Sequence, residues 1–280
     1  MSAEKVLKIG LIGDHIGQSR FSAAMNILCE LHSLTLDFTP IDTGEIDGFD
    51  FDAKVDEIIA DGWTGVTITH PYKVAARKRA AEGMSANVSH LTSCNILKFR
   101  AEIVGFNTDY TGFLGAWRAN MGETRPGRVA VAGAGGVAGA LVPALVSLGA
   151  EDIAIWDPVF ERAKQMAERA GGPVRAIDLE SASSAILAAD GLVNASALGM
   201  GGDRRSAFPA ESLGSQTWAF DAVYTPTDTP FLVAANAAGL KVISGFDLFR
   251  HMILGSFEAY SGVSPDPSVA WSKIDELRPA

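Results

Sequence analysis

Cysteine is scarce in this sequence. Only Cys29 and Cys94 occur among its 280 residues. Two cysteines cannot form a disulfide framework, and neither stands in the spacing pattern of a metal site. We therefore expect both thiols to be reduced and buried, and we expect no bound metal.

Basic residues are also fewer than acidic ones. The chain has 23 Lys and Arg against 33 Asp and Glu, which gives a formal net charge of −10. Binding to nucleic acid or to an anionic membrane through a general basic field needs the opposite balance. We therefore expect neither partner, although a local Lys or Arg can still bind an anionic small molecule.

Long apolar runs are nearly absent. Residues 1–8 contain no stretch that suits a signal peptide, so we expect a cytoplasmic protein. One run without charge, residues 129–150, has the 22 residues of a membrane span. Its clustered glycines and Pro143 instead favour a strand, a glycine turn and a buried helix.

The length and composition of the sequence suit two domains. Hydrophobic residues make up 48% and charged residues 20% of the chain, so a sizeable core can be buried. Strand-like and helix-like segments alternate, which predicts an α/β fold with mostly parallel sheets. In the first half we expect strands at 6–13, 34–40 and 65–69, helices at 22–32 and 73–82, part of a further helix at 55–60, and a hairpin of 95–100 with 102–105.

Turn residues at 122–127 open a second unit. There we expect strands at 128–134, 152–156, 191–195 and 218–223, with helices at 135–148 and 160–170. The whole chain is thus predicted to be an N-terminal, mostly parallel α/β domain followed by a C-terminal Rossmann dinucleotide-binding domain.

A glycine motif follows the first strand of the second unit. Gly133-Ala-Gly135-Gly136-Val137-Ala138 fits G-x-G-x-x-A. Gly133 permits the tight turn, Gly135 lets the backbone approach a pyrophosphate, and Ala138 lets helix and strand pack closely. The start of the next helix offers N–H groups and partial positive charge to phosphates. By itself the motif also suits a plain glycine turn or an S-adenosylmethionine site.

An acidic residue strengthens the dinucleotide interpretation. Asp157 closes the second strand of this unit, where a carboxylate can accept hydrogen bonds from the ribose of adenosine. The same carboxylate would repel a 2′-phosphate, so we expect NAD, with NADP less favoured. The alternative role for Asp157 is to cap the helix at 160–170.

Polar residues also follow predicted strands elsewhere, where ligands of parallel sheets bind. Lys73 lies just after the strand at 65–69, Asp109 lies in the turn 105–112, and the polar segment 221–230 follows a later strand. A Lys–Asp pair can hold a hydroxyl and relay its proton while a hydride leaves for nicotinamide. From spacing alone, the favoured interpretation is a solvated lysine and a turn-capping aspartate.

The order of these segments resembles the shikimate/quinate dehydrogenase family over nearly the whole chain. The matching elements are Gly10-Leu-Ile-Gly13 with Ser19, Thr69-His-Pro-Tyr-Lys73, Cys94-Asn95, Gly105-Phe-Asn-Thr-Asp109-Tyr-Thr-Gly112, Gly133-Ala-Gly-Gly136, Asn194-Ala-Ser-Ala-Leu-Gly-Met200, Asp221-Ala-Val-Tyr-Thr-Pro226 and Gly245 onward.

The resemblance implies a role for each matched residue. Lys73 and Asp109 correspond to the family's catalytic pair, and Ser19, Thr69, Asn95 and Tyr224 to its substrate contacts. The segment 194–200 would lie along the cofactor, so the expected cofactor residues beyond the glycine motif are Asp157, Asn194, Ser196, Leu198, Val223 and Gly245. The family also implies that the last helices return to the N-terminal domain, that the active site lies in the cleft between domains, and an association with aromatic amino acid biosynthesis.

Three substrate positions depart from the family pattern. Phe21 replaces a serine, Thr67 an asparagine and Met252 a glutamine. Each unmatched polar group of a substrate costs about 1–3 kcal/mol, so these changes would lower selectivity for shikimate. Neighbouring groups such as Arg20, Ser22 or His251 are candidates to compensate.

Together these features predict an NAD-dependent dehydrogenase of the shikimate type that acts on the ring secondary alcohol of a small cyclic hydroxy acid. Residues 1–112 and 245–280 would bind substrate, residues 113–244 would bind NAD, and the protein would be a monomer or homodimer. The alternatives are a related dehydrogenase with a less hydroxylated substrate, and an idle NAD-binding sensor. Retention of both Lys73 and Asp109 argues against the sensor.

Overall fold

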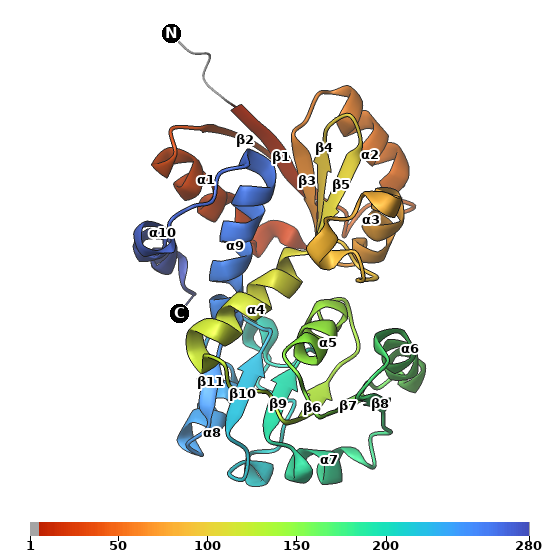
Figure 1. Cartoon of the computed structure of the whole chain (residues 1–280), viewed down its shortest axis with the longest axis vertical. Coiled ribbons are helices and arrows are strands. Elements are labelled where there is room, and N and C mark those ends of the chain that lie inside the picture. The colour runs from red at the N-terminus through yellow and green to blue at the C-terminus, as the bar shows by residue number, and fades with distance from the viewer. Residues whose placement is uncertain (1–5, 280) are drawn as a thin grey trace. The chain divides into compact units, whose positions relative to one another are not determined.

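The computed structural model describes residues 6–279. Contacts divide the chain into two compact units. The first comprises Met1–Thr108 and Met252–Leu277, and the second comprises Asp109–His251 and Arg278–Ala280. Each unit is built on its own β-sheet, and both sheets are largely or wholly parallel (Figure 1).

The first unit contains a five-stranded sheet in the order β2-β1-β3-β4-β5. The strands are β1 (Val6–Gly13), β2 (Thr35–Asp42), β3 (Gly65–Ile68), β4 (Ile96–Phe99) and β5 (Ile103–Phe106). β1 pairs in parallel with β2 and β3, whereas β4 is antiparallel to both of its neighbours. The predicted hairpin is confirmed as β4 and β5.

Helices cover both faces of this sheet. Figure 1 shows α1, α9 and α10 on one side, and α2 and α3 on the other. The bounds are α1 (Phe21–Leu31), α2 (Phe51–Ala60), α3 (Lys73–Ala80), α9 (Gly245–Ser261) and α10 (Pro267–Ile274), with short 3-10 turns η1 (Ile16–Gln18), η2 (Ala81–Gly83), η3 (Ala86–Val88) and η6 (Asp275–Leu277).

Two of these helices add to the prediction or differ from it. α2 contains the expected helical part 55–60 and begins at Phe51, because the Asp50 carboxylate accepts a hydrogen bond from the N–H of Ala53 and caps the helix. α3 ends at Ala80, before the expected Glu82, because Ala81 takes a positive φ of 45°.

The second unit contains a six-stranded parallel sheet in the order β11-β10-β9-β6-β7-β8. The strands are β6 (Arg128–Ala132), β7 (Asp152–Trp156), β8 (Val174–Ala176), β9 (Gly191–Asn194), β10 (Trp218–Asp221) and β11 (Lys241–Ile243). The order reverses between β6 and β9, which is the Rossmann arrangement and places a ligand crevice at the carboxyl ends of these two strands. The predicted α/β fold with two domains of this kind is confirmed.

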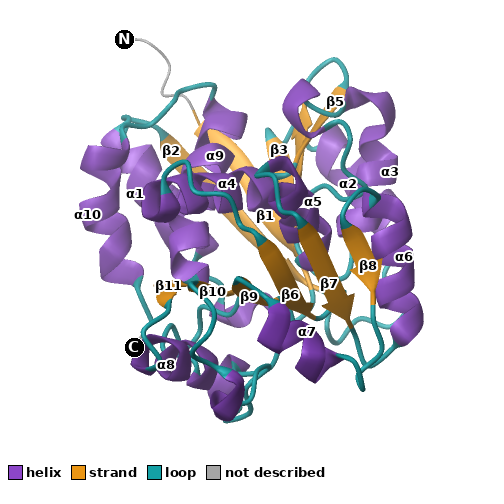
Figure 2. Ribbon diagram, turned by 60° about the horizontal axis from the view of Figure 1, so that its bottom comes forward, coloured by secondary structure: helices purple, strands orange, loops and turns teal. Residues whose placement is uncertain are grey.

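Helices also cover both faces of the second sheet (Figure 2). They are α4 (Thr108–Met121), α5 (Ala138–Ser147), α6 (Phe160–Ala170), α7 (Ala182–Ala188) and α8 (Pro230–Ala237), with the 3-10 turns η4 (Met200–Gly202) and η5 (Ala210–Ser212). α4 is fixed by aromatic contacts: the rings of Trp117 and Trp218 meet edge to face at 4.7 Å, and those of Phe113 and Phe220 at 4.9 Å. Such aromatic contacts stabilise the packing by more than the burial of their apolar area alone.

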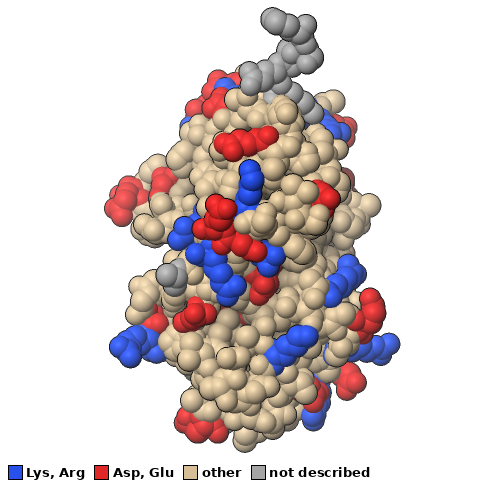
Figure 3. Space-filling view, turned by 90° about the vertical axis from the view of Figure 1, so that its left-hand side faces the viewer, with Lys and Arg blue, Asp and Glu red and all other residues tan. Residues whose placement is uncertain are grey.

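The surface fits the acidic composition. On the face in Figure 3, basic and acidic side chains are intermixed and no continuous basic surface forms. None of the helices in the described part of the chain combines the length and the apolar character needed to cross a membrane. Cys29 and Cys94 are free and buried, as expected.

Candidate active site

Lys73 is placed by the end of β3. It is the first residue of α3, five positions beyond Ile68, and is half-buried. Its backbone carbonyl accepts a hydrogen bond of 2.9 Å from the N–H of Cys94. This bond ties the start of α3 to the segment that leads into β4.

Asp109 lies in the first turn of α4 and is positioned through its neighbour Thr108. The side-chain oxygen of Asn95 accepts a 2.8 Å hydrogen bond from the N–H of Thr108, and the Asn95 amide nitrogen lies 3.0 Å from the Thr108 hydroxyl. Asn95 is 3% exposed. A carboxylate in the first turn is also favoured by the helix dipole. Asn95, expected to contact substrate, therefore also fixes where the helix of Asp109 begins.

Thr67 is bound to another residue of the protein. Its hydroxyl shares a 2.7 Å hydrogen bond with the hydroxyl of Tyr260 on α9, and both residues are buried. Burial raises the pKa of the Tyr260 phenol, so this group stays neutral. Thr69, two residues further, donates its backbone N–H to the carbonyl of Ile12.

Phe21 and Met252 occupy different surroundings. Phe21 opens α1, is 3% exposed, and packs with its ring centroid 6.2 Å from that of Phe38. Met252 is half-buried in α9, where its carbonyl accepts a hydrogen bond from the Ser256 hydroxyl. Tyr224, in the second unit, stacks on Phe249 at 5.4 Å.

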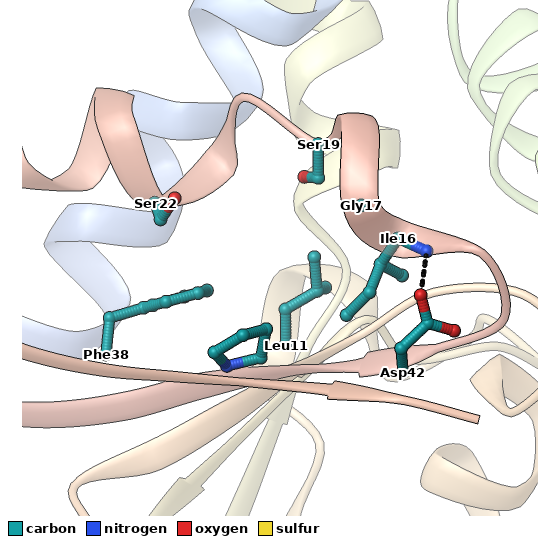
Figure 4. A pocket seen from close by; sticks show the side chains of 8 residues that line it. Leu11, Ile16, Gly17, Ser19, Ser22, Phe38 and Asp42 are labelled. Carbon is teal, nitrogen blue, oxygen red and sulfur yellow. Dashed lines mark hydrogen bonds between the residues drawn. The ribbon is translucent and has the colours of Figure 1, made fainter.

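A cavity of about 470 Å³ lies in the first unit and includes the expected substrate residue Ser19. We name it the β1–β2 cavity. Figure 4 shows Phe38 and Leu11 on the strand side and the hydroxyls of Ser19 and Ser22 opposite them. The residues that line it are Leu11, Ile16, Gly17, Ser19, Ser22, Phe38, Pro40 and Asp42.

The glycine turn after β6 has the geometry that its sequence predicts. Gly133 has φ of 97°, and a Cβ there would lie 2.9 Å from backbone atoms of Ala195 and Ser196, so only glycine fits. Gly135 and Gly136 are exposed, and a Cβ on either would meet no atom within 4 Å. Val137 precedes α5, and Ala138 begins it fully buried. The turn thus leaves open space in front of the α5 N-terminus, as a bound pyrophosphate requires.

Asp157 links two loops at the carboxyl end of this sheet. One carboxylate oxygen accepts a 2.9 Å hydrogen bond from the N–H of Ala134 in the glycine turn. The other accepts one of the same length from the N–H of Val159. The side chain is 9% exposed, and each oxygen keeps a second lone pair. The carboxylate organises the glycine turn and can still accept bonds from a ligand.

A buried amide and carboxylate shape the loop after β9. The Asn194 amide nitrogen donates to Asp221 at 2.9 Å and to the carbonyl of Leu198 at 3.0 Å. The Asn194 oxygen accepts from the N–H and the hydroxyl of Ser196. The expected cofactor residues Asn194, Ser196 and Leu198 therefore form one hydrogen-bonded turn beside Gly133.

Asp221 begins the polar segment 221–230 that the sequence singles out, but the sequence predicted no role for this residue itself. It ends β10 fully buried, and its carboxylate accepts hydrogen bonds from Asn194, from the N–H of Val223 and from the hydroxyl of Thr229. Burial raises its pKa to about 6 despite these bonds. The sequence feature that indicates this residue is its position directly after the apolar run Trp218-Ala-Phe220.

Gly245 is held close to the same segment. A Cβ there would lie 2.5 Å from the carbonyl oxygen of Ala222, so the backbone of α9 can begin at this point only with glycine. The expected cofactor residues of the second unit thus cluster at the carboxyl ends of β6, β7, β9 and β10.

Comparisons with known proteins agree with this arrangement. The family model described as shikimate / quinate 5-dehydrogenase matches residues 118–199. A quinate/shikimate dehydrogenase (NAD(+)) of Corynebacterium glutamicum strain R is 30% identical over 269 residues, covering 93% of this chain and 95% of that protein. A shikimate dehydrogenase (NADP(+)) of Maricaulis maris is 31% identical and covers 90% of this chain and 89% of that protein.

Solved structures show the same likeness. Quinate dehydrogenase from Corynebacterium glutamicum in complex with NAD has a TM-score of 0.89 at 29% identity, covering 98% of this chain and 99% of that one. Shikimate 5-dehydrogenase from Thermus thermophilus, in complex with NADP(H) and shikimate, has a TM-score of 0.81 at 30% identity, with 96% and 99% covered. The resemblance inferred from the motifs is confirmed, and the chain belongs to the shikimate/quinate dehydrogenase family of NAD(P)-linked dehydrogenases.

Proposed function

We propose that this protein is an NAD-dependent dehydrogenase that interconverts the ring secondary alcohol and the ketone of a small cyclic hydroxy acid of the quinate or shikimate type. The observation that carries the proposal is Asp157, a buried carboxylate bonded to the glycine turn. In this proposal the second unit binds NAD and the first unit binds the substrate.

The preference for NAD follows from charge. The free lone pairs of Asp157 suit the two ribose hydroxyls of adenosine, while a 2′-phosphate at the same place would be repelled. The next residues, Pro158 and Val159, offer no cation to pair with such a phosphate. The printed name of the Corynebacterium glutamicum relative, which specifies NAD(+), supports the same choice.

The catalytic pair in this proposal is Lys73 and Asp109. The ammonium of Lys73 would donate a hydrogen bond to the reacting oxygen, and the carboxylate of Asp109 would take up the hydroxyl proton. Bound nicotinamide supplies the hydride acceptor. The hydrogen bond from Cys94 fixes the backbone at Lys73, and the bond between Asn95 and Thr108 fixes it next to Asp109. Acid–base catalysis needs such preorganisation.

The substrate class rests on relatives and on residue chemistry. The similar proteins are named for quinate and shikimate, which are ring acids with several hydroxyls. Ser19 presents a hydroxyl at the β1–β2 cavity, and Thr69 follows the end of β3. Both suit hydrogen bonding to substrate oxygens.

The test is a rate measurement with four substrate and cofactor combinations. Quinate and shikimate are each incubated with NAD and with NADP, and reduced nucleotide is followed by its absorbance. We expect turnover of at least one acid with NAD at a kcat/KM well above that with NADP. Turnover with NADP alone, or no turnover of any ring hydroxy acid, would contradict the proposal.

A further inference from the structure

The walls of the β1–β2 cavity are mainly apolar. Leu11, Phe38 and Pro40 line it from β1 and β2, and Ile16 lines it from η1. Figure 4 shows the side chains of Leu11, Ile16 and Phe38. Leu11 and Pro40 are directly paired across β1 and β2, so they form one continuous apolar floor. A ligand group that fills this space gains from removal of apolar surface from water.

The cavity offers no cation to an anionic group. Among the lining residues in the described part of the chain there is no Lys, Arg or His, and the one charged side chain is that of Asp42. Asp42 accepts hydrogen bonds from the N–H groups of Gly44, His15 and Ile16. The Gly44 bond is the main cause of the lowered pKa of Asp42, so the carboxylate stays ionised and would repel a second carboxylate. The cavity therefore suits an uncharged part of a ligand.

Besides the Asp42 carboxylate, the polar side chains among the described lining residues are Ser19 and Ser22, whose hydroxyls lie opposite the apolar floor (Figure 4). The Ser19 hydroxyl oxygen accepts a long hydrogen bond of 3.3 Å from the N–H of Phe21. Ser19 is also a proposed substrate contact, so the cavity begins where the substrate ring would be held.

The size of the cavity exceeds what a ring acid alone needs. A volume of about 470 Å³ lies in the range of pockets that hold drug-sized ligands. Quinate and shikimate are smaller and are covered with hydroxyls, for which Leu11 and Phe38 provide no partners.

We propose that the preferred substrate is a cyclic hydroxy acid that carries one apolar substituent, such as an aromatic acyl group, which binds in the β1–β2 cavity. This inference rests on the proposed function, since it names the substrate class for the same site. Ser19 marks the boundary between the polar ring and the apolar substituent.

The test compares quinate and shikimate with the full panel of their monobenzoyl esters, in which one ring hydroxyl carries a benzoyl group. Burial of a phenyl-sized group should raise kcat/KM with NAD by roughly 10–100-fold for at least one ester over its parent acid. A wild-type enzyme that turns over the parent acids faster than every ester would overturn the inference and leave the proposed function intact.

A variant that adds volume to the cavity makes the test specific. Gly17 lines the cavity, and a Cβ on it would meet no atom within 4 Å, so Gly17→Leu adds a side chain there without a clash. This variant should abolish the advantage of the ester and leave kcat/KM of the parent acid within about two-fold. Gly17→Ala is the matched control, since it alters the same position while adding little volume.

The outcomes separate the two proposals. Equal losses for ester and parent acid in Gly17→Leu would show that the cavity does not hold the substituent. If Gly17→Leu does not fold, the inhibition of parent-acid turnover by the esters in the wild-type enzyme decides the question, and an inhibition constant no lower than the parent acid's KM contradicts the inference. Failure of the proposed function would instead appear as no reduction of NAD with any compound.

Discussion

The side-chain amide of Asn194 donates a hydrogen bond of 2.9 Å to the carboxylate of Asp221, and both residues are completely buried. The two residues end neighbouring parallel strands, β9 and β10. Asn194 in turn binds Ser196 and Leu198 and so shapes the loop that faces Gly133. One buried carboxylate therefore supports the loop that the sequence assigned to the cofactor.

The first prediction concerns this carboxylate and pH. The folded pKa of Asp221, about 6, lies above the ordinary value of 3.8, so the fold favours the neutral acid. Its stabilising contribution is complete below pH 3.8 and is lost as the pH rises through 6. Asp221→Asn cannot titrate. The free energy of unfolding of the wild type minus that of Asp221→Asn should therefore fall by roughly 2–3 kcal/mol between about pH 4 and 7.

Urea denaturation at several pH values measures this difference. Asp228→Asn, which removes an exposed carboxylate from the same segment, controls for the loss of one charge. A difference that is constant over this pH range, or that rises with pH, would show that Asp221 ionises in the fold without cost.

The second prediction concerns Thr67. Because its hydroxyl is bound to Tyr260, Thr67→Val would leave a buried phenol without a partner and should lower the free energy of unfolding by about 1–3 kcal/mol. Tyr260→Phe should cost a similar amount, and the double variant should cost less than the sum. Denaturation of the four proteins gives the coupling energy. Unchanged stability of Thr67→Val combined with a large rise in substrate KM would instead make Thr67 a substrate contact.

The third prediction concerns the choice of cofactor. Asp157→Ser with Pro158→Arg removes the carboxylate and adds a guanidinium that can bind a 2′-phosphate, so the NADP/NAD ratio of kcat/KM should rise by roughly 10–100-fold. Steady-state kinetics with both nucleotides measure the ratio.

Asp157→Asn is the control for this change. It removes the charge and keeps one of the two oxygens that accept from Ala134 and Val159, but it adds no guanidinium, so its shift should be in the same direction and smaller. A double variant that keeps the wild-type preference would remove Asp157 as the determinant of cofactor choice.

Much of the fold could be predicted from local sequence. The glycine motif at 133–138 follows a β-branched strand and precedes an alanine-rich helix, and each of these signals is local. The hairpin of β4 and β5 was likewise visible as two short apolar runs around a turn. For α2 the apolar pattern predicted only the part at 55–60, and the start at Phe51 depends on the capping side chain of Asp50.

The polar contacts between distant residues could not be predicted. Thr67 and Tyr260 are 193 positions apart, and their hydrogen bond depends on α9 packing over β3. Asp157 offered two roles in the sequence, a ribose acceptor or a helix cap. The structure instead shows its carboxylate bonded to the glycine turn as well, through Ala134, which only the pairing of β6 with β7 brings near.

The central claim is that Lys73 and Asp109 act as one catalytic pair. Each single alanine variant should lose roughly 10²–10⁴-fold in kcat, and the double variant should lose far less than the product of the two. Lys78→Ala, at an exposed position of the same helix, should keep its activity. NADH binding, followed by fluorescence, should barely change in any of them, since neither residue lies on the glycine turn.

The most direct test is therefore kcat with NAD for wild type, Lys73→Ala, Asp109→Ala and the double variant on the best substrate of the panel. We predict a large loss in each single variant that is strongly non-additive in the double variant, with NADH affinity intact. A wild-type protein that binds NADH but turns over no substrate of the panel would identify an NAD-binding sensor. Near-wild-type turnover in both single variants would contradict the account.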